Sequence, residues 1–575
     1  MKKILFAISI LLTACQSLSA QDSLYVQWAD RFQENKLLFS TATLDSIEFF
    51  ARGTMPVIRR YSPQFKNGYS DYRVNNLIKT DGSTNGTVCF GDPGLIVWKP
   101  KTSDQAYNND YNVESNRWTF KRSQESEHFI CFWDRPFGDN PNASTVPSSY
   151  RVNIDDLLKK AEQFYNTNIT RLGMVVVGQQ ATHKSRLNKY KMSIYLLYPG
   201  THDGVTIDNW VATGAGNDNT IGTLWITPAT CQPAGSTIAH EIGHTFQYQT
   251  YCDNIINGKA DDLRSGFRYG YPGSNGGCGF WEQCAQWVAH EDYPSETVSD
   301  YNFVNWTNQH HRHFEHEFHR YASYWEQYLW TEKHGITALG RIWNESVYPE
   351  DANQAYMRIF LDNNYDSLRA DLFEYAQKSV TMDFDHTRAY ANNRTWNWIT
   401  PAYDAFTVTL YDTLDGWKQI GYEQCVQPTG FSIIPLKLVK GGTELSLTVR
   451  GVDAGSLLPS ADPGKQVNAD GKQVATVTRY DVTDVSGHEG WALGFVALCG
   501  DKRVYSPATF ISNTDGAAAS TLSGTATFTV PEGATRLWAV VQGSPTEYRR
   551  CPWDDKEATD DQLPYQLKIT GTTLK

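Results

Sequence analysis

The chain has 575 residues, and 40% of them are hydrophobic, which is enough for ordinary hydrophobic cores. This length suggests roughly three to four domains' worth of material. The formal net charge of -12 comes without any basic run, which argues against nucleic-acid binding, because a nucleic-acid-binding protein needs a basic face.

The first twenty residues, MKKILFAISILLTACQSLSA, are typical of an export signal. They have a cationic start and an apolar run that is too short to span a bilayer. The end of this run, Leu12 to Cys15, resembles a bacterial lipobox, in which the cysteine would be lipidated and would be the only membrane attachment. The alternative is an ordinary signal peptide that is cleaved near Ala20. Both alternatives predict export of the protein to the cell surface, the periplasm or the extracellular space.

The chain contains ten cysteines, and nine remain without Cys15, so at least one must be unpaired. An exported protein meets an oxidising compartment, where disulfides persist. We expect a disulfide between Cys252 and Cys278, which would close a loop beside the motif described below.

Residues 21–105 are polar and contain short apolar runs, which predicts a strand-rich N-terminal segment. From about residue 125 the hydrophobic pattern indicates individual strands and helices. Strands are expected over residues 128–133, 192–198 and 222–227, and helical spacing of apolar residues predicts a helix over Ile154–Asn166. Helices dominate from residue 236 to about 385.

Residues 386–402 are expected to connect two domains. After them the hydrophobic period changes to two, as in ELSLTVRG and RLWAVVQG, and β-branched residues become frequent. This pattern predicts a C-terminal β-sandwich over residues 403–575. The predicted fold class is therefore α+β. A glycan-binding role of this sandwich is one hypothesis, and a structural or docking role is the other.

The sequence STIAHEIGHTFQYQ contains two histidines, His240 and His244, that are four residues apart. On a helix they project from the same face, so both imidazoles can reach one Zn²⁺ ion. Glu241 lies beside the first ligand. Zinc lowers the pKa of a bound water towards 7, and Glu241 can accept its proton when the water attacks a carbonyl.

Catalytic zinc needs a third protein ligand, and Glu282 in GFWEQCAQWVAH is the best candidate. Small residues at Ala285 and Ala289 would let this second helix approach the first. The structural alternative is that Glu282 is a carboxylate at a helix start, where the helix dipole favours it. His290 and Glu291 are the alternative ligands.

These two motifs, AHEIGHTFQYQ and GFWEQCAQW, resemble those of the gluzincin metallopeptidases, and in particular a family of secreted HExxH proteins of Bacteroidetes. HEIGHTFQ is also similar to the M60-like, enhancin-type peptidases, which attack mucin-like glycoproteins. The resemblance implies a gluzincin-like domain of mixed sheet and helices over residues 106–390, with a protein or glycoprotein substrate. It also implies that the strand in GTLWITPA is the sheet edge that binds extended substrate.

A second motif, HHRHFEHEFHRYASYW, brings five histidines together at positions 310, 311, 313, 316 and 319. It could form another metal site, but we expect a helix start that lines the cleft, because no carboxylate or cysteine partner matches the spacing. Gluzincins usually supply a downstream tyrosine or histidine to stabilise the oxyanion. His319, Tyr321 and Tyr324 are the candidates, and core packing is the alternative role of the tyrosines.

The sequence thus predicts an exported zinc metallopeptidase in which His240, His244 and Glu282 bind zinc and Glu241 is the general base. The alternative from another class is a surface adhesin or glycan-binding lipoprotein with a structural or vestigial zinc site. Glu241 favours the enzyme, because a structural site needs no base. A zinc hydrolase that acts on a non-peptide amide would carry the same motif.

Overall fold

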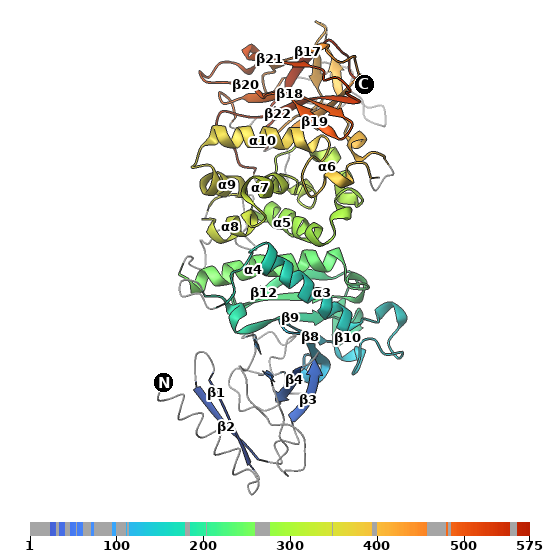
Figure 1. The fold of residues 1–575 in the computed structure, drawn as a ribbon, viewed down its shortest axis with the longest axis vertical. Helices are drawn as coiled ribbons and strands as arrows, with labels where there is room; N and C mark the ends of the chain where they lie inside the picture. Colours follow the sequence, from blue (N-terminus) through green and yellow to red (C-terminus); the bar gives the residue numbers. More distant parts are fainter. Residues whose placement is uncertain are drawn as a thin grey trace. The chain divides into compact units, whose positions relative to one another are not determined.

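The computed structural model describes most of the chain after residue 113, together with residues 95–98, 100 and 111 and five earlier strands (Figure 1). After residue 113 it leaves out residues 179–183, 203, 259–276, 348, 394–398, 414, 457–478, 481–484 and 552–559. The export signal predicted over residues 1–20 lies outside the described residues. No helix in the described part is long and apolar enough to cross a membrane.

The chain divides into two compact units. The first comprises residues 1–166 and 175–257, and the second comprises residues 167–174 and 258–575. Both contain helices and sheets, so the α+β class is confirmed.

Six of the described strands lie in the segment that was predicted to be strand-rich, and five of them form two small sheets. β1 (Ser23–Ala29) pairs with β2 (Glu34–Ser40), and a three-stranded sheet contains β3 (Ile47–Arg52), β4 (Met55–Arg60) and β5 (Asp71–Arg73).

The first unit is built around a six-stranded mixed sheet in the order β12-β13-β9-β8-β7, with β6 beside β9. Its strands are β6 (Ile96–Val97), β7 (Ser123–Glu125), β8 (Phe129–Trp133), β9 (Tyr190–Leu196), β12 (Ala212–Asn217) and β13 (Ile221–Ile226). A separate hairpin contains β10 (Gly200–His202) and β11 (Val205–Ile207). The sequence prediction of the sheet edge was wrong: the strand in GTLWITPA is β13, which lies between β12 and β9, and β12 is the edge.

Strands β8 and β9 are buried along their whole length, because both faces of the sheet are covered. Ile130 and Phe132 of β8 face a core of aromatic side chains that includes Trp118 and Tyr195. On the opposite side of β8, Phe129 meets Tyr165 edge-to-face, with 5.9 Å between the ring centroids. Tyr165 belongs to helix α3 (Ile154–Asn166), which packs beside helix α4 (Ser236–Ile256) (Figure 1).

The second unit begins with six helices: α5 (Gly277–Asp292), α6 (Tyr301–Gln309), α7 (Glu326–His334), α8 (Ala338–Glu345), α9 (Ala352–Phe360) and α10 (Tyr365–Ser379). Polar residues start several of them. Asp300 accepts a hydrogen bond from the backbone N–H of Phe303 at the start of α6, and Asp351 and Gln354 form a capping box at the start of α9.

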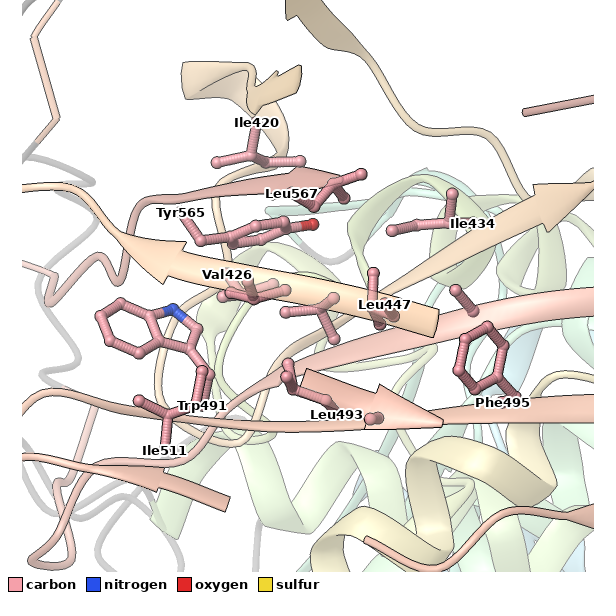
Figure 2. Packing of buried hydrophobic residues seen from close by; sticks show 14 of the residues in the cluster. Ile420, Val426, Ile434, Leu447, Trp491, Leu493, Phe495, Ile511, Tyr565 and Leu567 are labelled. Atoms are coloured by element: carbon pink, nitrogen blue, oxygen red, sulfur yellow. The ribbon is translucent and has the colours of Figure 1, made fainter. Parts of the chain in front are cut away.

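Two five-stranded antiparallel sheets follow. One has the order β14-β15-β23-β17-β21, and the other has the order β16-β22-β18-β19 with β20 beside β18. Their strands are β14 (Leu410–Asp412), β15 (Lys418–Ile420), β16 (Phe431–Leu436), β17 (Glu444–Gly451), β18 (Gly490–Cys499), β19 (Lys502–Tyr505), β20 (Thr509–Ser512), β21 (Ser523–Thr529), β22 (Arg536–Gly543) and β23 (Tyr565–Thr570). Side chains from both sheets, such as Leu447, Trp491 and Leu567, form one hydrophobic core (Figure 2).

Backbone hydrogen bonds join the helical part of this unit to the C-terminal sheets. Phe431 donates to the carbonyl of His310 over 3.0 Å, and Gln427 donates to the carbonyl of His311 over 2.8 Å. The Phe314 N–H donates to Thr429 Oγ1 over 2.8 Å. The division into two compact units falls after residue 257, and the domain boundary expected near residues 390–403 stays a prediction.

The predicted disulfide is not formed. Cys252 is a buried free thiol on α4, and the side chain of Cys278 lies outside the described residues. Burial raises the pKa of the Cys252 thiol well above its ordinary value, which leaves it in the unreactive protonated form.

Candidate metal centre

The HExxH residues lie on helix α4, as the spacing predicts. His240 and His244 are both buried, and their Nε2 atoms are 3.1 Å apart. Two nitrogens that bind one tetrahedral zinc at about 2.0–2.1 Å lie about 3.3 Å from each other. The two imidazoles are therefore arranged with the separation that a shared zinc ion requires.

Glycines on the sheet allow α4 to lie directly against β12 and β13. A Cβ atom on Gly214 would be 1.9 Å from the backbone oxygen of Glu241 and 2.8 Å from Cβ of His244. A Cβ atom on Gly222 would be 2.6 Å from the backbone oxygen of Thr245. Only glycine permits this approach, which places the HExxH turn on the edge strand.

We expect Gly214→Ala to displace α4 and to disturb the metal centre. Its new methyl group would meet backbone atoms, which cannot rotate away, so the cost should be at least the roughly 1–3 kcal/mol of an overpacked core. Thermal unfolding and zinc content of the purified protein measure both effects. Gly235→Ala is the matched control, because its methyl group would meet only the backbone oxygen of Pro233 at 3.9 Å. An unchanged zinc content in Gly214→Ala would contradict this account of the packing.

One carboxylate oxygen of Glu241 lies against the edge strand β12. Its Oε2 accepts a hydrogen bond from the backbone N–H of Gly214 over 2.6 Å. This bond fixes the orientation of the carboxylate and leaves Oε1 as the atom that can exchange a proton with a water molecule.

Glu282 lies on α5, where Tyr321 donates a hydrogen bond from its hydroxyl to Oε1 over 3.1 Å. His240, His244 and Glu282 each offer one ligand atom, and these atoms lie within 4.8 Å of one another. Among the described residues, no other group of three histidine, cysteine or acidic side chains meets this criterion.

The donor set fits zinc. Two imidazole nitrogens and a carboxylate oxygen are the three-ligand set of one class of catalytic zinc site, and they leave a coordination position open. The facing Nε2 atoms also suit a cation. Without one, one ring has to donate its Nε2–H to the lone pair of the other.

The alternative ligands make other contacts. Glu291 is buried and forms an ion pair with Arg171 over 2.5 Å. His290 Nε2 lies 3.1 Å from the side-chain amide of Gln286.

Of the three candidates for oxyanion stabilisation, only Tyr321 contacts a residue of the metal-binding group. Tyr324 is fully buried, and its hydroxyl donates to the backbone carbonyl of Thr297 over 3.1 Å. His319 is also buried, and its Nε2 lies 2.7 Å from the carbonyl oxygen of His313. Tyr324 and His319 thus have structural contacts, and Tyr321 remains the candidate.

The histidines at positions 310–319 do not form the predicted helix start. Only Glu317–His319 forms a short 3-10 helix, and the imidazoles bond mainly to the surrounding chain. His313 Nε2 donates to the backbone oxygen of Arg549 over 3.0 Å, and His316 Nε2 lies 2.8 Å from Oδ2 of Asp560. These contacts tie the segment to the C-terminal part of the chain.

Sequence reasoning missed two features of the centre. One is Gly214, whose signal is the unusual glycine content of the strand ATGAGN. The other is Gln247, one turn after His244, whose Oε1 lies 2.9 Å from His244 Nδ1. A buried polar residue three positions after a ligand is a signal that can be read from a helical wheel.

The chain belongs to a family of unknown function, DUF6055, whose model matches residues 95–575. The match covers both the HExxH helix and the C-terminal sheets. No curated protein and no solved structure has significant similarity to the chain.

Proposed function

We propose that this protein is a zinc-dependent metallopeptidase of the gluzincin type. One observation supports the proposal: His240, His244 and Glu282 lie close enough together to hold one metal ion, and Glu241, which is not part of this group, follows His240 in the sequence. A structural zinc site is usually closed by a fourth ligand and needs no adjacent base.

Zinc in this group would act as a Lewis acid that polarises a carbonyl and lowers the pKa of a water molecule. The chain supplies the remaining chemistry. Glu241, aligned by the Gly214 N–H, would take a proton from the attacking water and pass it to the leaving amine. Tyr321 is the candidate for donating a hydrogen bond to the developing oxyanion; its hydroxyl donates to Glu282 and would have to turn away from that carboxylate to do so.

The proposed fold is a gluzincin-like peptidase followed by a β-sandwich. The edge position of β12 supports a substrate that binds in extended form, because an edge strand has unpaired backbone groups on its outer side. The two C-terminal sheets with their shared core support the sandwich. The substrate would be a protein or glycoprotein. Export, with or without a lipid at Cys15, belongs to the same proposal and rests on the sequence of residues 1–20.

Zinc content tests the proposal first. Purified protein should hold about one zinc per chain, and His240→Ala or His244→Ala should lose it, because two remaining ligands hold zinc poorly. Glu282→Asp, which is shorter by one methylene, should keep part of the metal. Full zinc occupancy in both histidine variants, measured by elemental analysis, would refute the site.

A proteomic cleavage screen tests the reaction. The loaded protein should cut a subset of proteins or peptides, and the metal-free protein should not. A zinc-loaded protein that releases small-molecule amides but cuts no peptide bond would favour the non-peptide hydrolase instead.

A further inference from the structure

Gln247 makes a buried contact with one of the two histidines. It follows His244 by three positions on α4, so its side chain lies over the same face of the helix. Its Oε1 is 2.9 Å from His244 Nδ1, and both residues are at most 4% exposed. The contact is therefore shielded from water.

The chemistry of the two groups fixes the position of a proton. An amide oxygen only accepts hydrogen bonds, so Nδ1 of His244 must carry the hydrogen. A neutral imidazole has one N–H, which leaves a lone pair on Nε2. This is the atom that lies 3.1 Å from Nε2 of His240.

We propose that Gln247 is a positioning residue of the metal centre, which holds His244 in the tautomer and ring orientation that can bind a metal. The inference rests on the proposed function in that it needs the histidines to bind zinc, but it does not need the protein to cleave peptides. Partners of this kind commonly change metal affinity by about 10–100-fold.

The choice of glutamine has a further consequence. Metal-bound histidines often donate to a carboxylate, which would add a negative charge beside the ring. The amide of Gln247 orients His244 without adding this charge. A carboxylate in the same place should therefore keep the orientation and bind zinc at least as well.

Zinc affinity measured by competition with a chelator tests the inference. Gln247→Leu keeps the approximate size and removes the acceptor, and we expect zinc to bind about 10–100-fold more weakly. Gln247→Glu should bind zinc at least as tightly as the wild type. Thr245→Val is the control: Thr245 is equally buried beside His244, but its hydroxyl donates to the backbone oxygen of Ile242 and not to a ligand.

The outcomes separate this inference from the proposed function. If the wild type binds zinc and Gln247→Leu binds it equally well, Gln247 has no positioning role. If Gln247→Glu is weakened as much as Gln247→Leu, the contact does not act through its acceptor. Thermal unfolding of the metal-free proteins should place Gln247→Leu close to Thr245→Val, and a much larger loss of stability would assign Gln247 a packing role instead. A wild type without zinc would refute the proposed function itself.

Discussion

Glu241→Gln should keep its zinc and its fold but lose about 10²–10⁴-fold in kcat, because an amide cannot accept the proton of the attacking water. The structure explains why this substitution should remove the basic group without disturbing its surroundings. The amide oxygen of glutamine can still accept the hydrogen bond from the Gly214 N–H, so the side chain should keep its place on the edge strand. Elemental analysis, thermal unfolding and turnover of a substrate from the cleavage screen measure the three properties.

Glu241→Asp is the companion variant, because it keeps the basic group but shortens its reach. It should be intermediate in kcat. Wild-type turnover by Glu241→Gln at full zinc occupancy would show that Glu241 is not the general base.

His313→Gln should make the protein less sensitive to acid. Burial lowers the pKa of His313 to about 4 from an ordinary value of 6.5. The neutral ring is fully bonded: Nδ1 accepts from the backbone N–H of Glu315 over 3.1 Å, and Nε2 donates to the oxygen of Arg549 over 3.0 Å. Protonation would turn Nδ1 into a donor that faces another donor.

The direction in which the stability changes with pH follows from these pKa values. Below pH 6.5 the unfolded chain binds a proton at His313 and the folded chain does not, so the stability falls as the pH falls from 6.5 to about 4. The full effect is about 3 kcal/mol, of which about 2 kcal/mol is lost by pH 5. Glutamine can supply one acceptor and one donor without titrating, so the variant should escape this loss.

Chemical denaturation of both proteins at pH 7 and pH 5 measures the difference. Buried acids such as Asp300 and Asp351, whose pKa burial raises to about 6, act in the opposite direction, but they are common to both proteins and cancel. His488→Gln is a control, because that imidazole is partly exposed to solvent. Parallel losses of stability in the wild type and His313→Gln would contradict the prediction.

Elements with one buried face were predictable from the sequence. Helix α3 spans Ile154–Asn166 as expected, and β17 coincides with the alternating segment ELSLTVRG. Strand β22 coincides with RLWAVVQG but is buried on both faces along nearly its whole length. Strand β18 (Gly490–Cys499) does not alternate, because it is covered on both faces. Trp491 and Leu493 enter the core between the sheets, while a Cβ on Gly494 would meet side chains of α10.

The proximity of His240 and His244 was predictable because the helical period alone brings them together. The edge strand was not, since the strand nearest to the motif helix in sequence is not the outermost in space. A tight turn at Asp218 and Asn219, which both have positive φ, folds β12 back outside β13. Gly214 and Gln247 reach the HExxH residues only through contacts of the folded chain, which the sequence alone does not show.

The hydrogen bonds between residues 310–314 and residues 427–431 bear on how such a protein can change by evolution. Domains that are joined only by a flexible linker have few contacts with each other and can be exchanged as units. Here a shortened chain without the C-terminal sheets would leave backbone groups of the histidine-rich segment without partners, which is costly where water cannot reach them. Recombination that exchanges the two parts would have to replace the histidine-rich segment at the same time.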